Sequence, residues 1–259
     1  MIEQLEKREV NGGSISGDEE KGYRLEIPTV APGNYCLAQL DDYMHLSRRS
    51  FPHQAPIQMQ LQAKVSGENV AGTWGFGLWN DPFSLGFGAG GMSRLLPVLP
   101  KAAWYFYASP ENHLALKEGL PASGLHAKTF HSPLLPSLLS LLAVPGIPLI
   151  LWPAAARLIR KFAGMIVREA AQPLNIDVRE WHTYSLAWEA SQVTFMVDEE
   201  RVFVTPLSPQ GNLGLVLWID NQYFRFDPQG KLSFGFLPVD SVQTLWIRGL
   251  SVAGNASEG

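Results

Sequence analysis

Two stretches of the chain could carry acid chemistry, because each places tryptophan, asparagine and aspartate together where a strand is expected to end. They are Leu78-Trp79-Asn80-Asp81 and Leu217-Trp218-Ile219-Asp220-Asn221. A carboxylic acid in an apolar pocket has a raised pKa and can donate a proton. If both strands end on the same side of the fold, Asp81 and Asp220 are the candidate catalytic acids. The residues expected to line a ligand site beside them are Trp79, Asn80, Trp218 and Asn221. The alternative is ordinary turn chemistry, which uses the same residue types.

A third candidate is the aromatic run Trp104-Tyr105-Phe106-Tyr107, inside an expected strand at 102–108. Side chains of a strand alternate between its two faces, so one pair faces a ligand groove and the other pair faces the core. We expect Tyr105 and Tyr107 in the groove, because their hydroxyl groups need a hydrogen-bond partner or water. Such a groove predicts binding of an apolar or amphiphilic small molecule, such as a lipid or an isoprenoid. An enzyme that isomerises or cyclises such a ligand by acid initiation is the alternative function.

Short expected strands, separated by glycine, proline, asparagine and aspartate, must position these residues. They lie at 23–27, 35–40, 57–65, 73–79, 102–108, 183–188, 193–197, 201–204, 213–219, 223–226, 231–236 and 244–252. Many short strands with few helices are typical of an all-β sandwich or barrel. Residues 1–22 are polar and acidic and predict a mobile leader, whereas residues 23–259 predict a single domain.

One segment departs from this pattern, because residues 132–156 contain no charged residue. Five prolines within it would break a continuous membrane-spanning helix. We therefore expect a helical hairpin inserted at about residues 132–172, with an amphipathic second helix. The apolar side of that helix is formed by Leu158, Phe162, Met165 and Ile166.

This hairpin has several alternative roles. It could pack on the sandwich with its arginines in solvent, or cover the groove as a lid that brings Trp152 to the ligand. It could also lie on a membrane surface through residues 132–171, or form the interface of a homo-oligomer. The sequence alone leaves these alternatives open.

Bulk properties narrow the classes of partner. The net charge is −4 without a basic tract, which argues against nucleic-acid binding. The single cysteine, Cys36, forms no internal disulfide and offers no metal-ligand spacing. We expect no metal and no cofactor. The acidic N-terminal stretch is not a secretory signal, so a cytoplasmic protein, peripheral to the membrane if the hairpin binds lipid, is expected.

Two further stretches alternate aromatic or β-branched residues with others, which indicates two strands joined by a tight turn. They are Trp181-His182-Thr183-Tyr184-Ser185-Leu186-Ala187-Trp188 and Val193-Thr194-Phe195-Met196-Val197-Asp198. Together they match the pattern W-H-x-Y-x-x-x-W … v-x-F-x-V-D. In this the chain resembles the laminarinase-like glycoside hydrolases, family sixteen, of the concanavalin A-like lectin/glucanase superfamily. Residues 72–79 and 244–252 are similar to two other strands of that family.

The resemblance covers roughly residues 23–252 and implies an all-β, two-sheet antiparallel jelly-roll sandwich. The family carries its catalytic acids in an E-x-D-x-x-E motif, on a strand that by order corresponds to residues 102–108. Retaining glycoside hydrolysis needs two carboxyl groups about 5 Å apart on one face. Aromatic residues and alanines stand there instead, so no catalytic residue of the family is carried over. A carbohydrate-binding protein or degenerate glycoside hydrolase, with Trp79 and Trp218 as platforms for sugar rings, is a further alternative.

Overall fold

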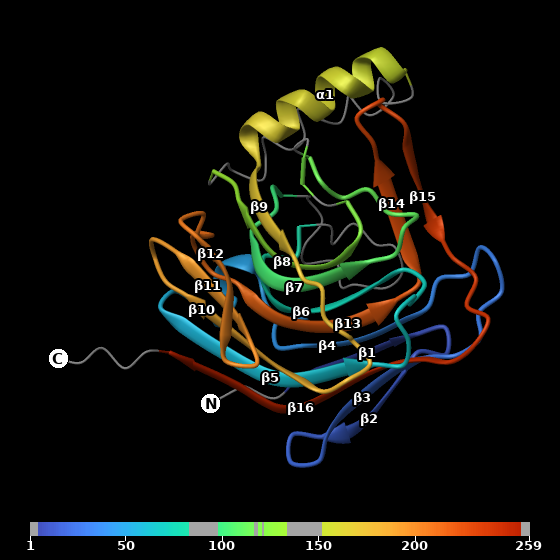
Figure 1. The fold of residues 1–259 in the computed structure, drawn as a ribbon, viewed down its shortest axis with the longest axis vertical. Helices are drawn as coiled ribbons and strands as arrows, with labels where there is room; N and C mark the ends of the chain where they lie inside the picture. Colours follow the sequence, from blue (N-terminus) through green and yellow to red (C-terminus); the bar gives the residue numbers. More distant parts are fainter. Residues whose placement is uncertain (1–4, 83–97, 117–118, 121, 134–151, 255–259) are drawn as a thin grey trace.

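The computed structural model describes residues 5–82, 98–116, 119–120, 122–133 and 152–254. These residues form two seven-stranded sheets packed face to face (Figure 1). The pairs of neighbouring strands in both sheets are antiparallel. The predicted all-β, two-sheet antiparallel sandwich is therefore confirmed.

Sheet A carries the expected aromatic strand near its centre. In spatial order its strands are β1 (Glu6–Val10), β4 (Leu37–Asp41), β13 (Gly214–Asp220), β6 (Thr73–Trp79), β7 (Ala102–Ala108), β8 (Gly124–His131) and β9 (Arg168–Pro173). Sheet B consists of β12 (Glu200–Thr205), β11 (Val193–Val197), β10 (His182–Trp188), β5 (Ile57–Val65), β16 (Gln243–Gly254), β3 (Gly22–Ile27) and β2 (Ser14–Asp18).

The main core lies between the sheets and follows from alternation of apolar and polar residues. In β5 the buried residues Ile57, Met59, Leu61, Ala63 and Val65 alternate with glutamines and a lysine that point outward. The predicted hairpin at 181–198 is present as β10 and β11, and its buried side chains continue the same layer. This period of two fixes which face of sheet B is covered.

Sheet A differs from sheet B because its central strands are buried on both faces. Every residue of β7 and of β13 is buried. One face contributes to the core between the sheets, and the other face forms a second, separate apolar cluster. Figure 1 shows the helix α1 (Pro153–Ile166) and the hairpin of β14 (Gln222–Phe226) and β15 (Leu232–Phe236) above the layer of sheet A, with β5 and β16 of sheet B below it.

The N-terminal residues differ from the expected mobile leader. Within 1–22, β1 pairs with β4 at the edge of sheet A, and β2 pairs with β3 at the edge of sheet B. Edge pairing needs backbone hydrogen bonds on one side only and tolerates charged side chains. Burial of Ile15 then anchors the segment in the core.

The expected helical hairpin is also corrected. Its first part falls on residues 134–151, which lie outside the described residues. The second part forms one helix, α1, that ends at Ile166 rather than near residue 171. The chain then enters β9, where Arg168–Pro173 pairs with β8 and completes sheet A. Backbone pairing along a sheet edge therefore overrides the helical pattern of the last few residues.

Candidate functional site

Four aromatic side chains form the floor of the candidate site, on the face of sheet A that points away from sheet B. They are Trp79, Trp104, Phe106 and Trp218, and we call this surface the aromatic face. The ring centroid of Trp104 lies 5.1 Å from that of Phe106 and 5.4 Å from that of Trp218. Trp79 stacks on Trp218 with an interplanar angle of 9° and a centroid distance of 6.4 Å. Trp104, Phe106 and Trp218 are each at most 9% exposed.

Two glycines of β6 make room for these rings. Gly75 lies opposite Trp218 on one side and Phe106 on the other, and Gly77 lies opposite Trp104. A Cβ atom at Gly77 would approach Trp104 Cα and Cβ to 2.5 Å. The glycines therefore let indoles from neighbouring strands lean across β6 and contact each other.

A hydrogen-bonded carboxyl group lies at one end of the aromatic face. Trp218 Nε1 donates to Thr73 Oγ1 at 2.9 Å, and Thr73 Oγ1 donates to Asp220 Oδ1 at 2.8 Å. Burial raises the pKa of Asp220 to about 7, although hydrogen bonds from Thr73 and Gln222 oppose this rise. Asp220 therefore keeps its proton at much higher pH than a carboxyl group in solvent does.

Buried ionisable groups lie at the other side of the same face, on β8 and β9. Lys128 Nζ is 3.0 Å from Glu169 Oε2, and both side chains are buried. His126, two residues before Lys128, faces the same way. Burial, with a contribution from the Lys128 charge, lowers the pKa of His126 to about 4. The imidazole is consequently neutral at physiological pH.

Two nitrogen atoms of this face are buried without a partner. Trp104 Nε1 and His126 Nε2 have no hydrogen-bond partner in the part of the chain that the structure describes. The two residues are on adjacent strands, two positions out of register, since Trp104 pairs with Lys128 and Phe106 with His126. A buried polar atom without a partner is costly, so these two nitrogens are the atoms of the aromatic face whose hydrogen bonding the described residues leave unsatisfied.

The expected orientation of β7 is reversed in the structure. Tyr105 and Tyr107 point into the core between the sheets, and Trp104 and Phe106 line the aromatic face instead. The hydroxyl group of Tyr105 reaches across to sheet B, 2.8 Å from Ser185 O and 2.7 Å from Met196 O. The Tyr107 hydroxyl donates to Glu68 O, in the connection between β5 and β6. Both tyrosine hydroxyls thus have backbone partners without a ligand or water.

The two candidate acids are not brought together. Because β6 and β13 are antiparallel, Trp79 pairs with Gly214 and Thr73 pairs with Asp220. Asp81 therefore follows one end of the strand pair and Asp220 stands at the other, about 20 Å away by strand rise. Asp81 lies in a turn with a φ of 44°, and its carbonyl oxygen accepts hydrogen bonds from Arg48. Only Asp220 has the environment expected of an acid.

The remaining candidates occupy structural positions. Asn80 binds backbone groups of Leu99 and Lys101, and the buried side chain of Asn221 binds those of Asn34, Cys36 and Leu237. These asparagines act as turn residues, the alternative that sequence analysis kept open. Trp152 is 66% exposed at the start of α1. Trp79 donates from Nε1 to the Tyr43 hydroxyl at the rim of the aromatic face.

The contribution of β8 and β9 was not predicted from the sequence. His126, Lys128 and Glu169 were not among the candidates, because neither strand was expected. Alternation of Leu125, Ala127 and Thr129 with larger polar residues was the available signal for β8. For β9 the helical pattern that precedes it masked the strand. Among the described residues, no group of His, Cys, Asp and Glu side chains has the arrangement of a metal site.

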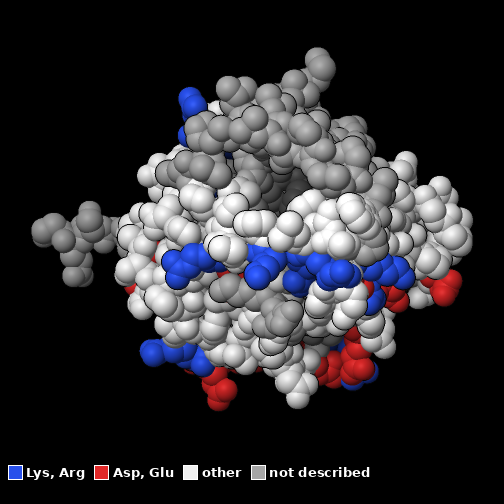
Figure 2. All heavy atoms as spheres, turned by 90° about the horizontal axis from the view of Figure 1, so that it is seen from above, with Lys and Arg blue, Asp and Glu red and all other residues white. Residues whose placement is uncertain are grey.

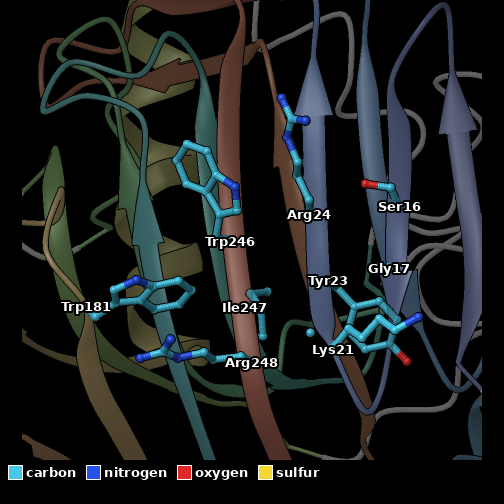
Figure 3. A pocket seen from close by; sticks show the side chains of 10 residues that line it. Ser16, Gly17, Lys21, Tyr23, Arg24, Trp181, Trp246, Ile247 and Arg248 are labelled. Carbon is cyan, nitrogen blue, oxygen red and sulfur yellow. The ribbon is translucent and has the colours of Figure 1, made fainter.

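A pocket lies on the outer face of sheet B. Figure 3 shows Trp181, Trp246 and Arg248 on one side of it and Lys21, Tyr23 and Arg24 on the other, around a volume of about 230 Å³. Lys64 Nζ is 5.4 Å from the centroids of both tryptophan rings, and Arg248 Cζ is 4.1 Å from that of Trp181. The indole faces are thus already covered by cations of the chain. These contacts between cations and indole rings are suited to stabilising neighbouring strands of sheet B.

No family model matches the sequence, and no curated protein matches it either. Solved structures do resemble it. A glycoside hydrolase family protein from Mycobacterium thermorestibile is 15% identical, over 92% of this chain and 79% of that one, with a TM-score of 0.47. The catalytic domain of an endo-1,3-β-glucanase (laminarinase) from Thermotoga petrophila is 12% identical, over 95% and 82%, with a TM-score of 0.45. A sialidase is 7% identical with a TM-score of 0.45, and the match covers 97% of this chain but only 17% of the sialidase.

Proposed function

We propose that the aromatic face binds a carbohydrate and does not hydrolyse it. A sugar ring presents C–H groups on its faces and hydroxyl groups around its edge. Aromatic rings bind the former, and convergent polar side chains bind the latter. The observation that carries the proposal is a pair of buried nitrogens, Trp104 Nε1 and His126 Nε2, which have no hydrogen-bond partner among the described residues and lie beside four aromatic rings.

These two nitrogens favour a hydroxyl-rich ligand over a hydrocarbon. The indole nitrogen can only donate a hydrogen bond, and the neutral imidazole of His126 can donate or accept according to its tautomer. Hydroxyl groups can serve both. A purely apolar ligand would leave both atoms buried without a partner, at a cost of about 1–3 kcal/mol for each.

The positions of the buried carboxyl groups on the strands of sheet A support binding without hydrolysis. Asp220 pairs with Leu37 of β4, and Asp41 lies four residues further along that strand. The two carboxyls are therefore about 13 Å apart by strand rise. Glycosidases need about 5 Å for retention or about 6.5–9.5 Å for inversion. Glu169 is on the far edge strand, beyond both distances from either residue, and is paired with Lys128.

An amphiphilic ligand is the second candidate, favoured by the apolar residues that continue the aromatic face. Leu37, Phe51 and Val216 belong to the same cluster as the tryptophans and could contact the hydrocarbon chain of a lipid or isoprenoid. If the protein is an enzyme acting on such a ligand, Asp220 is the acid, since Asp81 lies at the opposite end. Replacement of Asp220 by asparagine would then abolish turnover and leave binding intact.

Binding to a glycan array, followed by titration calorimetry with each positive glycan, tests the carbohydrate proposal. Trp104→Phe keeps an aromatic ring but removes the Nε1 donor, so we expect weaker binding by about tenfold, the worth of one hydrogen bond. Trp181→Phe, on the outer face of sheet B, is the matched control and should bind as the unmodified chain does. Silence of the array at high protein concentration would reject the proposal.

Native mass spectrometry of protein purified without detergent distinguishes the second candidate. A co-purifying lipid or isoprenoid that disappears in Trp104→Ala but persists in Trp181→Ala would replace the carbohydrate by an amphiphile at the same face. A chain that carries no such compound and binds glycans supports the first proposal.

A further inference from the structure

The helix α1 is docked with its apolar side facing outward. The side that contacts the rest of the protein is formed by Ala156 and Arg160, which are buried, as is Val167 directly after the helix. The large apolar side chains are on the opposite side and are exposed: Leu158 by 56%, Phe162 by 54%, Met165 by 69% and Ile166 by 43%. An amphipathic helix on a globular protein normally does the reverse.

Specific contacts fix this orientation. Arg160 Nε donates to Phe226 O at 2.9 Å, Nη1 donates to Leu116 O at 2.6 Å, and Nη2 donates to Ala115 O. The guanidinium thereby joins α1 to β14 and to the segment that follows β7. Hydrogen bonds to a charged donor are each worth about 1.5–3 kcal/mol, so rotation of α1 to bury its apolar side would forfeit several of them.

Cations flank the exposed apolar stripe. Arg157 and Lys161 are exposed on α1 and, at about 100° per residue, lie about 40° apart, between the apolar stripe and the buried side. Arg168 is exposed as well, at the start of β9 directly after the helix. Figure 2 looks down on the side where α1 lies in Figure 1 and shows a row of Lys and Arg side chains across it.

The charge of this region is opposite to that of the whole chain. Residues 152–168 contain four cationic residues and no aspartate or glutamate, although the chain has a net charge of −4. A fixed apolar stripe with cations along one flank is complementary to an anionic bilayer, whose headgroups attract the cations while the apolar side chains enter the acyl boundary. Arginine, methionine and aromatic residues also occur at protein interfaces, so a second copy of the chain is the competing occupant that the experiment must separate from a bilayer.

We propose that α1 is a membrane-surface helix that attaches this protein to an anionic lipid bilayer. Leu158, Phe162 and Met165 enter the bilayer surface, and Arg157, Lys161 and Arg168 contact lipid headgroups. The helix lies on the bilayer rather than across it: in the described part of the chain, no helix is long and apolar enough to span a membrane. This inference is independent of what the aromatic face binds.

Co-sedimentation of the full chain with vesicles tests the inference. We expect binding to vesicles of phosphatidylcholine mixed with phosphatidylglycerol, weaker binding as salt is added, and much weaker binding to phosphatidylcholine alone. The double variant Phe162→Ser, Met165→Ser should lose at least about tenfold in partitioning, because each side chain no longer contributes apolar area. Lys161→Gln with Arg168→Gln should lose about thirtyfold, at about 1 kcal/mol for each cation near an anionic surface.

The matched control is Val204→Ser with Val242→Ser, which removes two exposed apolar side chains far from α1 in sequence (42% and 48% exposed). It should bind vesicles as the unmodified chain does. Equal losses in the control and in the α1 variants would overturn the inference, as would equal binding to neutral and anionic vesicles. Light scattering measures the oligomeric state and tests whether the exposed side of α1 joins two copies of the chain. A dimer that dissociates in Phe162→Ser, Met165→Ser and never binds vesicles would make the surface an interface between two copies and reject the membrane.

Discussion

A Cβ atom at Gly75 would lie 2.7 Å from Cη2 of Trp218, so the indole of Trp218 occupies the place that any side chain at position 75 needs. The same atom would also meet the carbonyl oxygen of Tyr105. Neither atom can move away easily. The Trp218 ring packs among other aromatic residues, and the Tyr105 carbonyl oxygen belongs to the backbone of a central strand. The arrangement of rings in the aromatic face therefore requires glycine at position 75.

Gly75→Ala is expected to destabilise the protein by about 1–3 kcal/mol, the usual cost of overpacking a dense site, and to displace the Trp218 ring. Urea unfolding and near-ultraviolet circular dichroism measure the two effects. Gly67→Ala is the control, because no atom lies within 4 Å of a Cβ at that position. A Gly75→Ala protein as stable as the control would contradict this account of the aromatic face.

Tyr105→Phe should lower stability without affecting ligand binding. The variant removes a hydroxyl group that is buried between the sheets and bonded to backbone carbonyl oxygens of sheet B. We expect a loss of about 1–2 kcal/mol in the free energy of unfolding. Ligand affinity should stay unchanged, in contrast to Trp104→Phe. Weaker binding by Tyr105→Phe would mean that the tyrosines, and not Trp104 and Phe106, determine the site.

Asp220 and His126 should give opposite dependences of stability on pH. The pKa of Asp220 rises from 3.8 to about 7 on folding, so its contribution is fully favourable below pH 4 and is lost as pH rises to 7. The pKa of His126 falls from 6.5 to about 4, so its contribution is complete above pH 6.5 and is lost as pH falls to 4. Each slope is at most about 1.4 kcal/mol per pH unit, and between pH 4 and 6.5 the two oppose each other.

Removing one titrating group should therefore reveal the pH dependence of stability that the other group causes. Relative to the unmodified chain, Asp220→Asn should become more stable as pH rises from 4 to 7, and His126→Gln less stable as pH rises from 4 to 6.5. Chemical denaturation across this range, with differences taken at each pH, provides the measurement. Parallel curves for all three proteins would show that neither pKa is shifted by folding.

The buried pair of Lys128 and Glu169 should be much more costly to break than to remove. Glu169→Gln leaves the Lys128 ammonium buried without its counterion, and a loss of about 3–5 kcal/mol is expected. The double variant Lys128→Met, Glu169→Gln removes both charges and should recover part of that loss. Lys21→Gln, at an exposed ion pair, serves as a control with little effect. A double variant whose loss equals the sum of the single losses would show that the two residues are not coupled.

Alternation along individual strands was enough to predict most of the architecture. In β5 the period-two pattern gave the strand over residues 57–65 with its inner and outer faces. The aromatic and β-branched residues of β10 and β11 predicted the hairpin that the structure contains. These predictions succeeded because one face of sheet B is exposed, so the polar and apolar residues must separate.

The tertiary structure determined which residues form the candidate site, because their contacts depend on pairing between strands that are distant in the sequence. β7 is buried on both faces, so its sequence does not indicate which pair of aromatics faces the ligand. The partners of the Tyr105 hydroxyl come from residues 80 and 91 positions away. The antiparallel pairing of β6 and β13 separates Asp81 from Asp220, whereas the pairing of β8 and β9 joins Lys128 to Glu169, 41 residues later. The sequence by itself determined the strands and their covered faces, and only the register between strands determined which side chains meet.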